Sequence, residues 1–155
     1  MRDRTCCFTG HRFIPGDTLP ELSGRLEATL HRLIRDGIRY FGAGGALGFD
    51  TLAAETVLSL RELYPQIRLI LVLPCRDQAS GWRHADIMRY ENTLKKADRV
   101  VYTSEHYYRG CMSRRNRHLV DNSSVCVAYC TRSTGGSACT MNYAIKQGLT
   151  VISLV

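Results

Sequence analysis

The stretch FGAGGALGFD, residues 41–50, joins the end of an apolar run to the start of a helical pattern. It holds four glycines in ten residues, although glycine inside a regular element costs roughly 0.5–1 kcal/mol relative to alanine. This concentration indicates a turn where something approaches the backbone closely. A glycine-rich turn that leads into a helix offers free backbone N–H groups and the positive end of the helix dipole. That combination binds phosphate.

On both sides of this stretch, apolar runs of period two alternate with amphipathic runs of period 3.6. The predicted strands cover residues 5–9, 38–42, 67–74, 99–104, 124–130 and 150–155. The predicted helices cover residues 19–37, 50–65, 82–98, 113–123 and 135–148. Strict alternation of this kind implies parallel strands joined by right-handed crossovers. We therefore predict one doubly wound α/β sandwich, in a single domain over residues 1–155.

Local signals support two of the helices. In the first helix, the apolar residues on one face are Leu22, Leu26, Leu30, Leu33 and Ile34. Gly37 is placed to end this helix, because glycine favours the position after a helix C-terminus. Asp50 is placed to cap the N-terminus of the second helix.

The composition is that of an ordinary soluble protein, with 45% hydrophobic and 23% charged residues. No apolar run approaches the roughly 18 residues of a membrane span, so we expect no membrane association. The N-terminal sequence MRDRTCCFTG lacks the apolar region of a signal peptide, so we expect a cytoplasmic protein. A net charge of +7 favours an anionic partner, but does not choose between a nucleotide, a phosphate ester and a nucleic acid.

The seven cysteines form no CxxC pair and no paired zinc spacing. We expect buried free thiols, with structural zinc as a minor alternative. Cys111 lies between basic residues, which leaves a catalytic thiolate open as a second alternative. No cluster of His, Asp and Glu has metal-binding spacing, so we predict neither a metal nor a cofactor.

Unusual residues follow the predicted strands rather than precede them. In a parallel sheet, ligands bind beyond the carboxyl ends of the strands, so these residues predict a site at that edge. Two glycine clusters lie there and are candidate phosphate-binding loops. The first consists of Gly44, Gly45 and Gly48, and the second of Gly135 and Gly136, followed by Ser137 and Thr140. The alternative is that these glycines only make tight turns and close helix–strand contacts. Neither cluster is a Walker A loop or a full GxGxxG motif.

Other residues of this edge are candidates with named roles. Arg115 and Arg12 are candidate phosphate ligands, because a guanidinium binds phosphate with two parallel hydrogen bonds. Asn116 is a candidate for reading a ribose or a base edge. For Arg115 and Arg12 the alternative is a solvated side chain.

Three further residues, Gly10, His11 and Trp82, complete the candidate ligand-binding set. Gly10 and His11 follow the first strand, and His11 is a candidate ligand donor or acid–base group, with a loop histidine as the alternative. Trp82, like the pair Tyr107 and Tyr108, is a candidate for stacking on a base, with plain packing as the alternative.

Acidic residues are scarce near this edge. Asp50 and Glu55 form the only nearby acidic couple and are weak candidate catalytic groups. We expect Asp98 and Asp121 to be turn and cap residues.

Five motifs together resemble a known family: FTGHR, GGALGFD, P…Q…W, RGCMSRRNRHLVDNS and GGSACTMNYA. In this order they resemble the uncharacterised YpsA-like bacterial proteins of the SLOG superfamily, named for the DNA-processing protein DprA (Smf) and the Lonely Guy phosphoribohydrolases. The resemblance covers nearly the whole chain. It implies a Rossmann-like three-layer α/β sandwich, with a mainly parallel sheet of about six strands and helices on both faces. It also implies a nucleotide or nucleotide-derived ligand, and a homodimer is an expectation from the family.

One departure from the superfamily bears on its chemistry. Lonely Guy enzymes carry the motif PGGxGTxxE, and the position of its glutamate holds Asn142 here. An amide cannot replace a carboxylate in acid–base chemistry or in stabilising an oxocarbenium charge. The sequence therefore favours a sensor-type module that binds a nucleotide-derived ligand. Two alternatives are a nucleotide N-glycoside hydrolase and a DprA-like protein that binds single-stranded DNA.

Overall fold

The computed structural model describes residues 1–155 and contains one six-stranded, all-parallel sheet. Its strands are β1 (Thr5–Gly10), β2 (Tyr40–Ala43), β3 (Arg68–Leu73), β4 (Arg99–Tyr102), β5 (Val125–Tyr129) and β6 (Thr150–Ser153). They lie in the order β4-β3-β2-β1-β5-β6. A single 3-10 turn, η1 (Arg2–Arg4), precedes β1 and was not predicted.

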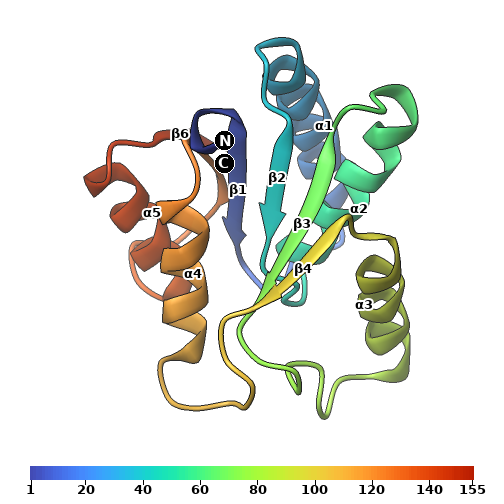
Figure 1. The fold of residues 1–155 in the computed structure, drawn as a ribbon, viewed down its shortest axis with the longest axis vertical. Helices are drawn as coiled ribbons and strands as arrows, with labels where there is room; N and C mark the ends of the chain where they lie inside the picture. Colours follow the sequence, from blue (N-terminus) through green and yellow to red (C-terminus); the bar gives the residue numbers. More distant parts are fainter.

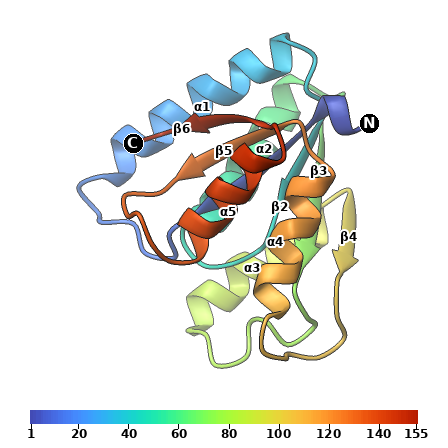
Figure 2. The same cartoon turned by 90° about the vertical axis from the view of Figure 1, so that its left-hand side faces the viewer.

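Five helices cover the two faces of the sheet. They are α1 (Leu19–Arg35), α2 (Phe49–Leu63), α3 (His84–Lys96), α4 (Cys111–Asp121) and α5 (Gly136–Lys146). The sheet separates α1, α2 and α3 from α4 and α5 (Figure 1), and α4 and α5 lie side by side (Figure 2). The predicted three-layer, Rossmann-like α/β sandwich is confirmed. None of the helices combines the length and apolar character that crossing a lipid bilayer requires.

The first two helices show how local sequence sets the element ends. The predicted apolar face of α1 is buried, and Gly37 follows its C-terminus with φ +102°. The N-cap of α2 is Gly48 rather than the predicted Asp50. Gly48 has φ +76°, in the left-handed region that residues with a Cβ avoid, so the N-cap lies two positions earlier than predicted. Asp50 lies inside the first turn.

Apolar side chains fill both spaces between the layers. The larger core lies between the sheet and the layer of α1, α2 and α3, and contains Phe41 and Phe49. A smaller cluster beneath α4 and α5 includes Cys7 and Cys126, which are paired across β1 and β5. Five of the seven free cysteines are buried as predicted, whereas Cys130 is half-buried and Cys139 is exposed.

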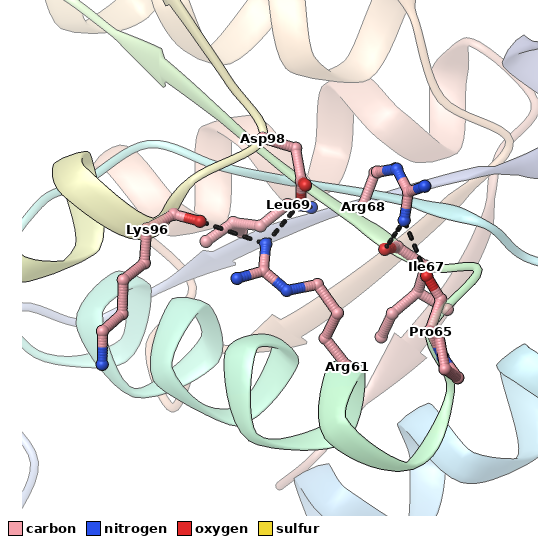
Figure 3. A network of polar contacts seen from close by, with 7 residues as sticks. All are labelled: Arg61, Pro65, Ile67, Arg68, Leu69, Lys96 and Asp98. Atoms are coloured by element: carbon pink, nitrogen blue, oxygen red, sulfur yellow. Dashed lines mark hydrogen bonds and ion pairs between the residues drawn. The ribbon is translucent and has the colours of Figure 1, made fainter.

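At the amino-terminal edge of the sheet, polar side chains form hydrogen bonds with one another and with the backbone (Figure 3). Arg61 of α2 donates hydrogen bonds to the Lys96 carbonyl at 3.0 Å and to the Asp98 carboxylate at 2.7 Å. Asp98 also accepts the N–H of Leu69 at 2.8 Å, in agreement with its predicted turn role. Arg68 donates to two carbonyl groups in the turn before β3. These polar groups are therefore satisfied within the protein.

Candidate ligand-binding site

The order in which the chain adds strands to the sheet reverses between β1 and β5. Chain connections run outward from β1 to β4 on one face, and then return through α4 to β5 on the other. At such a switch point the loops after the two strands diverge, which opens a crevice at their carboxyl ends. A cavity of about 260 Å³ lies there, and we call it the narrow cavity. It is lined by eight of the predicted ligand-binding residues: Gly10, His11, Arg12, Arg115, Asn116, Gly135, Gly136 and Ser137.

The N-terminus of α5 opens on the narrow cavity. Its N-cap is Gly135, with φ +100°, and no side chain caps the helix. A Cβ built on Gly135 or Gly136 would meet no atom within 4 Å. The first N–H groups of an α-helix have no partner inside the helix. The start of α5 therefore presents uncapped donors and the positive end of the helix dipole to open space.

Two exposed arginines line the cavity beside this helix start. Arg12 follows β1 and Arg132 follows β5, and neither side chain makes a hydrogen bond or an ion pair with the protein. A third arginine, Arg115, also lines the cavity, and Asp50 is the only carboxylate among the lining residues. The cavity therefore has an excess of positive charge, which suits an anion. The chain has no group of three or more His, Cys, Asp or Glu side chains arranged to hold a metal.

Arg115 is buried, and its guanidinium forms hydrogen bonds within the protein instead of being free to bind a ligand. Its side chain is 3% exposed and donates hydrogen bonds to the Gly44 carbonyl and, at 2.8 Å, to Oδ1 of Asn116. Asp50 lies nearby, buried, and accepts the N–H of Ala46 at 3.3 Å. Burial raises the pKa of Asp50, while the charge of Arg115 opposes that rise. These contacts tie α4 to the loop between β2 and α2.

The glycines of the first predicted loop face protein instead of the cavity. A Cβ on Gly44 would overlap the guanidinium of Arg115, and a Cβ on Gly45 would overlap the side chain of Leu73. A Cβ on Gly48 would overlap the carbonyl of Arg12. None of the three glycines lines the narrow cavity, whereas Ala46 of the same loop does. This loop therefore requires glycines because its backbone lies in close contact with other parts of the protein.

Two other candidates of the ligand-binding set lie outside the narrow cavity. Trp82 packs edge-on against Tyr90, with ring centroids 5.2 Å apart. Thr140 donates its hydroxyl to the Gly136 carbonyl at 3.0 Å and lines a separate hollow between α4 and α5. The exposed Tyr107 and Tyr108 lie in the loop before α4 and do not line the narrow cavity.

The groups considered for catalysis are also placed by the structure. Glu55 forms a bidentate ion pair with Arg89, at 2.7 and 3.0 Å, and does not line the cavity. Asn142 is exposed on α5 and does not line the cavity. Cys111 is 1% exposed, as the first residue of α4, and so lies in the interior instead of a polar loop. Asp50 remains the one candidate carboxyl that reaches the cavity.

His11 links the loops that follow β1 and β5. Its Nε2 accepts the N–H of Thr131 at 2.8 Å, and its ring lies edge-on to Tyr129 at 5.4 Å. Burial, together with the nearby charge of Arg132, lowers the pKa of His11 below its usual value of 6.5. The hydrogen bond requires an unprotonated Nε2, so the neutral imidazole is the form that holds the two loops together.

Six lining residues were not among the predicted site residues: Phe8, Thr9, Ala46, Met112, Arg132 and Thr134. Arg132 and Thr134 belong to TRSTGG, the segment that follows the fifth predicted strand and ends in the glycine pair Gly135 and Gly136. The sequence could therefore have indicated Arg132 and Thr134, because the whole segment follows a predicted strand at the carboxyl edge of the sheet. Met112 has no comparable signal, since nothing in the sequence indicates which side of α4 meets the cavity.

The comparisons with known proteins agree with this architecture. A family model described as the YspA SLOG family matches residues 17–149, and the chain belongs to that family. An uncharacterised SPbeta prophage-derived protein of Bacillus subtilis, YoqJ, is 30% identical over 145 residues, which cover 85% of both chains. A UPF0398 protein of Halalkalibacterium halodurans is 33% identical over 99 residues. That match covers 63% of this chain and about half, 52%, of the relative.

Two solved structures share the fold. DNA processing protein A of Helicobacter pylori, described as having a unique single-stranded DNA binding mode, superposes with a TM-score of 0.68 at 19% identity. The corresponding protein of Streptococcus pneumoniae, DprA, superposes with a TM-score of 0.71 at 15% identity. The likeness covers 96% and 97% of this chain, but 64% and 50% of theirs. At these identities it shows a common fold.

Proposed function

We propose that the chain binds a nucleotide or a nucleotide-derived molecule as a sensor-type module, with a phosphate at the N-terminus of α5. One observation carries the proposal. The uncapped, side-chain-free start of α5 opens on a cavity at the switch point, and two arginines without protein partners line the same cavity. Membership of the SLOG family supports the proposal.

The chemistry of the lining residues suits a phosphate ester. The free N–H groups of the first turn of α5 are fixed donors that an anion can accept without reorganising the loop. Arg12 and Arg132 add guanidinium groups, which bind phosphate oxygens with charge-assisted hydrogen bonds. The hydroxyl groups of Thr134 and Ser137 lie in the same lining. A bound anion would also relieve the repulsion between the two arginines.

A substitution of Gly136 tests the proposal without disturbing the fold. Gly136 has open space at its Cβ position and no positive φ, so a side chain fits there. Gly136→Asp places a negative charge where the phosphate is proposed to bind. A carboxylate at a helix N-terminus is itself favourable by about 0.3–1 kcal/mol, so the variant should fold at least as well as the parent. Gly24→Asp makes the same change at an open position of α1 outside the narrow cavity.

The measurement is a thermal-shift screen with AMP, ADP, NAD and ADP-ribose. A ligand that binds only the folded state raises the melting temperature. We expect at least one nucleotide to raise it for the parent chain and for Gly24→Asp, and none to do so for Gly136→Asp. The proposal is wrong if no nucleotide shifts the parent chain, or if Gly136→Asp responds as strongly as the parent.

A nucleotide N-glycoside hydrolase is the second candidate function, and Asp50 is the observation that favours it. Asp50 is the only carboxyl group in the lining, and its burial raises its pKa. A carboxyl with a raised pKa keeps its proton at higher pH and can protonate a leaving base. Incubation with AMP and with NAD, followed by chromatography for free base, tests this function. Release of base that persists in Asp50→Asn would remove Asp50 from the reaction.

A further inference from the structure

A second, wider cleft adjoins the narrow cavity on the side of α1. It has a volume of about 630 Å³ and lies between the start of α1 and the carboxyl ends of β5 and β6. Three residues, His11, Arg12 and Arg132, line both the cleft and the cavity. The two spaces are therefore neighbours across a common boundary, and both unpartnered arginines belong to that boundary.

Away from this boundary, the lining of the wider cleft combines apolar side chains with one paired arginine. Leu22, Tyr129 and Leu154 are buried side chains that contribute to its lining. Phe13 lines it as well, and with 76% exposure it is the most exposed of the large apolar side chains in the chain. An exposed phenyl ring directly after Arg12 is an aromatic face next to a cation.

The free positive charge is confined to one end of the cleft. Arg25, the third arginine in its lining, pairs with Glu21 at 2.8 Å and donates to the Leu154 carbonyl at 3.3 Å. Arg25 is therefore bound to protein partners, unlike Arg12 and Arg132. An occupant that matches this pattern has an anionic group at one end and an apolar, flat group at the other, as a nucleotide does.

Size also favours an occupant that extends across the boundary. Small-molecule sites have volumes of about 300–1,000 Å³. The narrow cavity, at about 260 Å³, lies below this range, and the wider cleft, at about 630 Å³, lies within it. A nucleotide with its phosphate in the narrow cavity thus needs the wider cleft for its remaining part.

We propose that the wider cleft is the nucleobase site and that the base stacks on Phe13, while the phosphate binds beyond the boundary formed by Arg12 and Arg132. This inference rests on the proposed function, because it assigns the second half of the same ligand. It names the ligand as a base-bearing nucleotide rather than a phosphorylated sugar or free phosphate. Phe13 would be the residue that favours a nucleotide over a ligand without a base, because only a base can stack on its ring.

Calorimetric titrations of the parent chain and of Phe13→Ala test the base site. The probes are the four nucleoside 5′-monophosphates and ribose 5-phosphate, which carries the phosphate and sugar without a base. Stacking on an aromatic side chain is worth about 1–3 kcal/mol per base, or about 5- to 140-fold in affinity. We expect Phe13→Ala to weaken the best-bound monophosphate by that factor and to leave ribose 5-phosphate unchanged. Phe13→Trp should retain the affinity and report binding through quenching of the new indole.

Tyr107→Ala is the matched control, because Tyr107 is 64% exposed but lines neither space. The outcomes separate the two proposals. If a monophosphate binds and Gly136→Asp abolishes its binding, but Phe13→Ala leaves its affinity unchanged, the base site is wrong and the phosphate site stands. If ribose 5-phosphate binds as tightly as every monophosphate, the base site is wrong; if neither these probes nor the nucleotides of the thermal-shift screen bind, both proposals are overturned.

Discussion

Glycine has two different physical roles among the residues of this site. At Gly48 the backbone lies against the carbonyl of Arg12 and has φ +76°, so both the space and the conformation exclude a side chain. At Gly136 the space is open and φ is not positive, so a side chain is excluded by neither. The sequence shows the same letter at both positions, and only the structure separates a packing requirement from an open helix start.

This difference predicts that substitution by alanine destabilises the protein at Gly48 but not at Gly136. Gly48→Ala should lower the free energy of unfolding by about 2 kcal/mol or more, because it combines a steric overlap with a strained backbone. Gly136→Ala should leave the free energy of unfolding unchanged or raise it slightly. Urea denaturation of both variants is the measurement. Equal stability of the two would contradict the packing assigned to Gly48.

The lowered pKa of His11 predicts a pH dependence with a definite sign. Because the folded state holds the neutral imidazole, the unfolded state binds more protons near and below pH 6.5. The contribution of His11 to stability is therefore present above pH 6.5 and is lost as the pH falls through its lowered pKa. The parent chain should lose more stability than His11→Gln between pH 7.5 and pH 5. A steeper loss in His11→Gln, measured by urea denaturation at both pH values, would reverse the assignment.

Among the elements, the contact of α4 with the loop before α2 depends on a buried pair of opposite charges. Arg115 supplies a donor to Gly44, and its charge partly compensates the buried Asp50. Removal of one buried charge leaves the other uncompensated, which costs about 3–5 kcal/mol in comparable cases. For this reason weaker nucleotide binding by Arg115→Ala would not by itself place Arg115 on the ligand.

A double-mutant cycle tests this coupling. Arg115→Met should lower the free energy of unfolding by about 3 kcal/mol, because Asp50 then lies buried beside an apolar side chain. Asp50→Asn in the same chain should restore at least about 1 kcal/mol, since the uncompensated charge is gone. Additive effects of the two substitutions, measured by urea denaturation, would show that the residues do not interact.

The elements themselves were predictable because each carries a clear period. The leucine face of α1 and the continuous apolar run of β3 identify a helix and a strand without further information. The parallel sheet, and with it the gathering of loops at one edge, follows from their alternation. Ends were less certain, as Gly48 in place of Asp50 at the N-cap of α2 shows.

The sequence pattern could not predict which residues of the site contact one another. The position of β5 beside β1 brings Arg132 next to Arg12, and local periodicity contains no information about strand order. Likewise, the overlap of a Gly44 side chain with Arg115 joins residues that are far apart in the chain. The second glycine cluster, unlike the first, lies at the cavity, which only the tertiary structure could distinguish.

At the scale of the whole molecule, one sheet connects all the elements that carry the site. We propose that residues 1–155 form a single domain and unfold as one cooperative unit. Far-ultraviolet circular dichroism reports all helices, whereas the fluorescence of Trp82, the sole tryptophan, reports the loop before α3. The two probes should give coincident urea transitions. Separate transitions would show that the region around Trp82 unfolds independently of the rest, which contradicts a single cooperative unit.

The central claim is that the start of α5 holds the phosphate of a nucleotide. The most direct measurement is a titration of the ¹⁵N-labelled chain with the best-bound nucleoside monophosphate, followed through its amide resonances. The account predicts that the amides of Gly136, Ser137 and Ala138 shift the most, with a smaller change at Gly45 and Gly48. Shifts concentrated at Gly45 and Gly48, with the start of α5 unperturbed, would contradict it.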